Sequence, residues 1–159
     1  MTVSEAREAK DRELRALQAA LAAEHAAVYG YGVVGGRIGK DRRPEARTAY
    51  DAHRARRDAL VRAVKDVGGE PVAAAAGYAL PFQVPDAAAA VRLAAELEDR
   101  VAGVYGDLVR AGTGERRREA ADAMREAAVR SVRWSSRSVA FPGLAERGGP
   151  ASGSPAPTT

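Results

Sequence analysis

The stretch GGEPVAAAAGYALPFQVPD, residues 68–86, decides the fold of this chain. Its three prolines and its opening glycine pair prevent a regular helix, because proline lacks the amide hydrogen that a helix needs and glycine favours other backbone conformations. Its valine, tyrosine, leucine and phenylalanine side chains are nevertheless too apolar for a free linker. We therefore expect an ordered strap that lies across the domain.

Two amphipathic helices are predicted before this strap. The first begins near Thr2, where Thr2 and Glu5 have the spacing of a capping box, and ends within the glycine-rich residues 30–39. The second begins at Pro44, because proline is favoured in the first turn of a helix, and continues to the strap. In both, apolar residues recur every three or four positions, which is typical of one buried helical face.

Two further helices are predicted after the strap. The third begins behind Asp86, a favourable N-cap, and the fourth follows Thr113 and ends at Pro142. The remaining residues are almost entirely Gly, Ser, Pro, Ala and Thr, which cannot bury enough apolar surface to fold. We expect a helical domain over residues 1–144 and a disordered tail over residues 145–159.

The lengths of the connections predict the topology. The connections before the second and the fourth helix are short, so each joins antiparallel neighbours. A helix of about 24 residues is about 36 Å long, whereas an extended strap of this length reaches about 60 Å. The strap can therefore run the full length of the bundle and make the second and third helices parallel. This predicts an all-α, antiparallel four-helix bundle with a long crossover between helices 2 and 3, the ferritin-like connection.

Composition excludes several functions. The 159 residues contain no cysteine, which excludes disulfides, thiol catalysis and thiolate metal sites. The net charge is only +4, and the basic runs at residues 37–43 and 116–118 fall at opposite ends of the predicted bundle, so we expect no nucleic-acid partner. The charged N-terminus and the lack of a long apolar run lead us to expect a soluble cytoplasmic protein with no membrane segment.

Each predicted helix carries polar side chains at or near positions where a hydrophobic residue belongs. These are Glu24 in the first helix, Tyr50, His53 and Arg57 in the second, Glu98 in the third, and Glu126 and Arg130 in the fourth. At 1.5 Å per residue they lie within about one helical turn of a common height. We therefore expect them to form one buried polar network in the middle of the bundle.

Buried charges must be paired, hydrogen-bonded or bound to metal, and two interpretations of this layer meet that requirement. In the first, Glu24, His53 and Glu98 are the ligands of iron or manganese. In the second, Arg57 and Arg130 neutralise the carboxylates in a salt-bridge network that includes His53. The presence of two arginines beside the carboxylates favours the second interpretation.

The sequence resembles a bacterial ferritin-like domain family of unknown function over roughly residues 14–144. The resemblance rests on LQAALAAEHAAVYGYG (17–32), AHRARRDAL (52–60), YALPFQVPD (78–86), LEDRVAGVYGDL (97–108) and RWSSRSVAFPGL (133–144). It implies the ferritin-like bundle but no established activity.

Di-metal proteins of the ferritin-like superfamily use a Glu on helices 1 and 3 and a Glu-x-x-His pair on helices 2 and 4. Glu24, His53 and Glu98 match three of these six ligands, whereas Tyr50 replaces the second-helix glutamate and the fourth helix has no histidine. We therefore expect a degenerate centre in a structural or interaction module, acting as a homodimer, with no catalytic residue. The alternative is an iron- or manganese-binding redox protein with a reduced ligand set.

Overall fold

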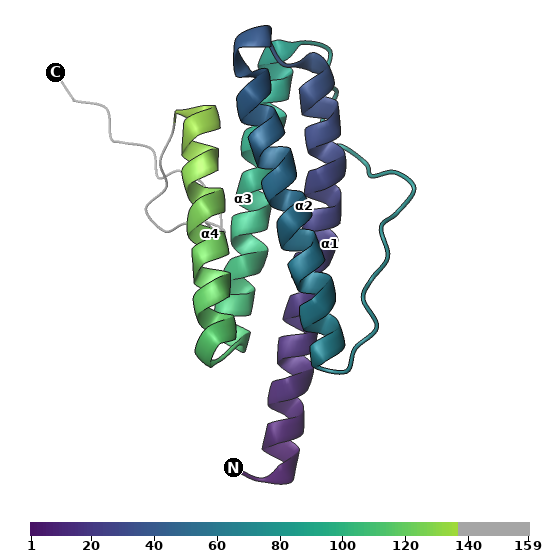
Figure 1. Ribbon diagram of the computed structural model, residues 1–159, viewed down its shortest axis with the longest axis vertical. Coiled ribbons are helices and arrows are strands. Elements are labelled where there is room, and N and C mark those ends of the chain that lie inside the picture. The colour runs from purple at the N-terminus through teal and green to yellow at the C-terminus, as the bar shows by residue number, and fades with distance from the viewer. Residues whose placement is uncertain (137–159) are drawn as a thin grey trace, which may run out of the picture.

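The computed structural model describes residues 1–136 as a bundle of four helices (Figure 1). These are α1 (Val3–Arg37), α2 (Arg43–Asp66), α3 (Ala87–Ala111) and α4 (Gly114–Ser135), with a short 3₁₀ turn η1 (Lys40–Arg42) before α2. Within this part of the chain there is no strand, so the predicted all-α class is confirmed.

The predicted starts of α1 and α3 are confirmed by capping interactions. The backbone amide of Glu5 donates to the Thr2 hydroxyl at 3.2 Å, and the amide of Thr2 donates to the Glu5 carboxylate at 2.6 Å. Asp86 caps α3 by accepting from the amide of Ala89 at 2.8 Å. Pro44 lies in the first turn of α2. The Thr2, Glu5 and Asp86 side chains satisfy amide groups that have no partner inside the helix, whereas Pro44 has no amide hydrogen to satisfy.

Helix α4 ends earlier than predicted. Its last residue is Ser135, and Ser136 takes a left-handed conformation with φ of 56°, which closes the helix instead of Pro142. The predicted tail at 145–159 and the end of the predicted domain at residue 144 lie outside the described residues.

The strap sets the helix directions as predicted. Figure 1 shows it leaving the end of α2 and running along the outside of the bundle to the start of α3, so that α2 and α3 are parallel. Helix α1 holds the strap: the Gln18 side chain donates to the carbonyl of Glu70 and accepts from the amide of Val72. The His25 ring bonds the carbonyl of Val72 at 3.0 Å.

Helix α1 passes through the glycine-rich stretch without a break and ends at Arg37. Packing against α3 explains the glycine at position 30, because a β-carbon there would lie 2.5 Å from Leu97 Cδ1. The missing side chain allows α1 and α3 to approach closely in the middle of the bundle.

The core has two apolar clusters, one toward each end of the bundle. The first contains Leu17, Leu21, Leu60, Val64 and Leu108, among others. The second contains Tyr31, Val34, Leu93, Leu97 and Trp134, among others. The predicted polar layer lies where these clusters meet. Among the described helices, none has an apolar run long enough to span a membrane.

Candidate functional site: a buried polar cluster

Three fully buried polar side chains meet at the centre of the bundle. Glu24 of α1, His53 of α2 and Glu98 of α3 have no exposed surface. His53 Nδ1 lies 2.6 Å from Glu24 Oε2, and His53 Nε2 lies 3.0 Å from Glu98 Oε1. The imidazole therefore bridges two carboxylates that come from different helices.

This geometry requires a protonated imidazole, because ionised carboxylates only accept hydrogen bonds and both ring nitrogens must donate. Burial alone would lower the pKa of His53, but the hydrogen bonds and negative charges of Glu24 and Glu98 outweigh burial and raise the pKa to about 9. At neutral pH His53 is accordingly a buried cation.

Arg130 brings α4 into the cluster, since its Nε donates to Glu98 Oε1 at 2.9 Å. Burial alone would raise the pKa of Glu98, but the contacts with His53 and Arg130 hold that pKa below its ordinary value. Two carboxylates and two cations then sum to zero charge. This balance is the condition under which charged groups are tolerated in a protein interior.

Two tyrosines donate further hydrogen bonds to the carboxylates. Tyr105 donates to Glu24 Oε1 at 2.7 Å, and Tyr31 donates to Glu98 Oε1 at 2.5 Å. Trp134 Nε1 donates in turn to the Tyr31 hydroxyl at 2.9 Å. Burial and the adjacent carboxylates raise the pKa of both tyrosines, so they remain protonated donors.

The predicted polar network did not include these three aromatic residues. A signal was present: Tyr31 follows Glu24 by seven residues and Tyr105 follows Glu98 by seven. Seven residues are close to two helical turns, so each tyrosine lies on the same helical face as the glutamate of its own helix.

The prediction that Tyr50, Arg57 and Glu126 join this network is wrong. The Tyr50 ring lies beside the Arg54 guanidinium, 5.6 Å from it. Arg57 extends to the surface and pairs with its neighbour Asp58 at 2.8 Å. A long, flexible arginine keeps its charge in water when it can, so position in the seam does not bring its guanidinium into the core.

Glu126 is exposed and pairs with Arg56 of α2 at 2.8 Å. Its side chain therefore bridges α2 and α4 outside the core. Of the two arginines expected to neutralise the carboxylates, only Arg130 does so, and it binds Glu98.

One carboxylate oxygen is left over. All three donors to Glu98 converge on Oε1, and among the described residues no hydrogen-bond partner reaches the buried Oε2. An unpaired buried oxygen is costly, which makes this the position where a water or another small donor would be stabilised.

The side chains present do not fit a di-metal centre. To act as a metal ligand, His53 would need a free lone pair on one ring nitrogen, but both of its nitrogens are directed at carboxylates. Arg130 donates to Glu98 Oε1 and places a positive charge beside the carboxylate that a cation would approach. Within residues 1–136, no three histidine or acidic side chains are placed to hold a metal.

Residues 16–146 match the protein family described as "Domain of unknown function (DUF4439)". The match covers most of the sequence. The chain belongs to this family. The predicted ferritin-like family of unknown function is thereby confirmed together with the fold. None of the curated proteins matches the sequence.

Two solved structures are similar to this member of the family. A conserved hypothetical protein, rv2844, from Mycobacterium tuberculosis is 38% identical, with a TM-score of 0.76 over 78% of this chain and 95% of that one. A ferritin-like, diiron-carboxylate protein from Bacillus anthracis str. Ames is 15% identical, with a TM-score of 0.71 over 84% and 96% of the two chains. The second likeness shows the ferritin-like fold alone.

Proposed function

We propose that this chain is a ferritin-like domain in which the cations of its own side chains replace the metal centre, leaving a structural or interaction module. The observation that carries this proposal is the His53 ring, which is bound through both nitrogens to Glu24 and Glu98. In a di-metal protein of this fold such carboxylates would face the metal ions.

The charge balance supports the same conclusion. His53 and Arg130 supply two positive charges against the two carboxylates, so an added divalent cation would leave the cluster with an excess of buried positive charge. Metal binding would require His53 to lose its proton. With a pKa of about 9, that loss costs on the order of 3 kcal/mol at pH 7.

Elemental analysis tests this proposal directly. Protein expressed with added iron and manganese should contain less than about a tenth of an equivalent of either metal after purification. In ¹⁵N NMR spectra at pH 7, both His53 ring nitrogens should carry a proton. Stoichiometric metal that disappears in Glu24→Ala and His53→Ala variants would overturn the proposal.

One observation favours a second candidate, an iron- or manganese-binding redox protein with Glu24, His53 and Glu98 as its ligands. The unpaired Glu98 Oε2 is an oxygen donor that no other described group uses. Loading with metal would then displace Arg130 from Glu98. Comparison of Arg130→Gln with the unaltered chain in the same metal analysis separates the two candidates, because only the second predicts tighter metal binding in the variant.

A further inference from the structure

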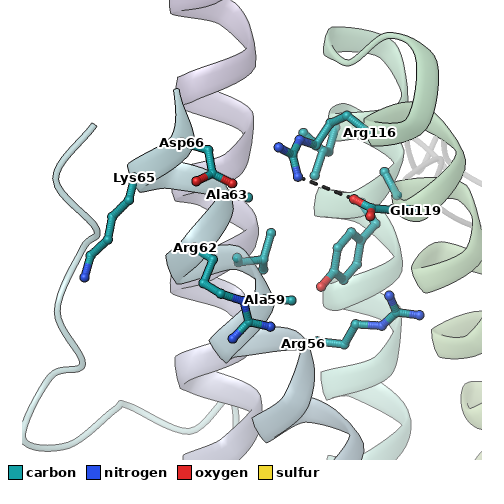
Figure 2. Close-up of a pocket in the computed structure, with 12 residues that line it drawn as sticks. Arg56, Ala59, Arg62, Ala63, Lys65, Asp66, Arg116 and Glu119 are labelled. Atoms are coloured by element: carbon teal, nitrogen blue, oxygen red, sulfur yellow. Dashed lines mark hydrogen bonds and ion pairs between the residues drawn. The ribbon is translucent and has the colours of Figure 1, made fainter. Parts of the chain in front are cut away.

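A groove opens between α2 and α4 beside the buried cluster. Helix α1 packs against α2 and α3, and α3 packs against α4, whereas α2 and α4 barely approach each other. The groove encloses about 440 Å³ between α2, α3 and α4 (Figure 2). Its walls carry the small side chains of Ala59 and Ala63 on α2 and Ala120 on α4, which are too short to fill the space between the helices.

The floor of the groove is apolar. It is formed by Leu60 of α2 and by Leu108 and the Tyr105 ring of α3, all of them buried. An apolar floor favours a ligand with an apolar body, since contact removes the ligand's apolar surface from water. Tyr105 also connects the groove to the polar cluster, because its hydroxyl donates to Glu24.

The rim of the groove is cationic. Figure 2 shows Arg56, Arg62 and Arg116 around the opening, while the Lys65 side chain extends away from it. Among residues 1–136 no carboxylate pairs with Arg62. The buried Nε of Arg116 makes no hydrogen bond in the same part of the chain, although it lies 3.5 Å from the Glu13 carboxylate.

Two of the three arginines are partly engaged. Arg56 is paired with Glu126. Arg116 lies 3.4 Å from Glu119, which also lines the groove. Each guanidinium has five N–H donors, so the one carboxylate contact of Arg56 and the two of Arg116 leave donors available. Asp66 is the second acidic residue of the lining, and these two carboxylates disfavour a ligand with several negative charges.

We propose that this groove binds a small organic monoanion, a carboxylate attached to a flat apolar body. The apolar body lies on the floor of Leu60, Leu108 and Tyr105, and the carboxylate accepts hydrogen bonds from Arg62 at the rim. Arginine suits this role because its planar fork matches the two oxygens of a carboxylate. The inference goes beyond the proposed function and holds whether or not the polar cluster binds metal.

A titration followed by ¹H–¹⁵N NMR spectra of the full chain tests this site. The probe is naphthalene-2-carboxylate, and naphthalene-2-carboxamide is the matched neutral compound. The carboxylate should produce saturable shifts of the amides of Ala59, Ala63 and Ala120, with an affinity about tenfold higher than that of the carboxamide. Equal affinities, shifts confined to other surfaces, or no saturable binding would each overturn the proposal.

Three variants locate the binding. Arg62→Gln should weaken binding of naphthalene-2-carboxylate by about three- to tenfold. Ala59→Leu should abolish binding by filling the groove, and the exposed position of Ala59 allows this variant to fold. Arg54→Gln removes the same charge from α2 outside the groove and should leave the affinity unchanged. Unaltered binding in either of the first two variants would overturn the site.

Discussion

The hydroxyl of Tyr105 on α3 donates a hydrogen bond of 2.7 Å to Glu24 on α1. The hydroxyl of Tyr31 on α1 donates a hydrogen bond of 2.5 Å to Glu98 on α3. Each tyrosine follows the carboxylate of its own helix by seven residues but binds the carboxylate of the other helix. Because α1 and α3 are antiparallel, the two tyrosine–carboxylate hydrogen bonds are related by a pseudo-twofold axis, and His53 lies between the two carboxylates. The pairing fixes the register of α1 against α3.

The reciprocal hydrogen bonds predict a measurable loss of stability when either tyrosine hydroxyl is removed. Tyr105→Phe and Tyr31→Phe should each lower the free energy of unfolding by about 1–3 kcal/mol, because a buried carboxylate oxygen loses a donor. Urea denaturation measures the change. Tyr29→Phe is the matched control, since Tyr29 is 40% exposed, and it should be close to neutral. Equal stabilities of all three variants would contradict the role of the hydroxyls.

The protonated His53 predicts that stability falls as the solution becomes alkaline. Its pKa is raised from 6.5 to about 9 in the folded protein, so its contribution is complete below the unfolded pKa and is lost as the pH rises through the folded one. The loss is on the order of 3 kcal/mol. Denaturant midpoints measured between about pH 6 and pH 9.5 should show this decline.

Two variants assign that decline to His53. His53→Asn should flatten it, because the titrating group is gone. His25→Gln should preserve it, since His25 contacts the strap and lies outside the cluster. A decline that survives unchanged in His53→Asn would assign the pH dependence to other groups.

The distinction between Arg130 and Arg57 gives a paired test of the cluster. Arg130→Met leaves the two carboxylates with His53 as their only cation. The variant should lower the free energy of unfolding by about 2–4 kcal/mol, because one buried negative charge is then uncompensated. Arg57→Met removes an arginine that pairs with Asp58 near the surface and should cost less than about 1 kcal/mol. Thermal and urea denaturation measure both. Similar losses in the two variants would mean that Arg130 does not neutralise the cluster.

The features that the sequence predicted follow from regular geometry. Thr2 and Asp86 are caps whose side chains bond amides a fixed number of residues away, so they are readable from spacing. The common height of Glu24, His53 and Glu98 follows from the constant rise of a helix and the directions set by the strap.

The features that the sequence did not predict depend on side-chain reach and on the rotation of whole helices. Arg57 lies in the seam but extends to Asp58, while Arg130 reaches Glu98 from α4. Helical spacing gives the angle of a β-carbon but does not determine where a guanidinium several bonds further along comes to rest. The roles of Tyr31 and Tyr105 were likewise hidden, because a tyrosine in a seam looks like ordinary packing until its partner on another helix is known.

Two neighbouring glycines of α1 predict opposite effects of the same substitution. Gly32 has no atom within 4 Å of a built β-carbon, so Gly32→Ala should stabilise the exposed helix position by up to about 1 kcal/mol. At Gly30 the same methyl group would meet Leu97 at 2.5 Å. Overpacking of a buried contact costs about 1–3 kcal/mol, which exceeds the gain in helix propensity.

Gly30→Ala should therefore lower the free energy of unfolding, while Gly32→Ala raises it, when both are measured by urea denaturation. A Gly30→Ala, Leu97→Ala double variant should lose less stability than the sum of the two single variants, because the smaller Leu97 replacement makes room for the methyl group. If Gly30→Ala stabilised the chain as Gly32→Ala does, Leu97 would have a second rotamer available, and the close approach of α1 to α3 would not depend on the glycine.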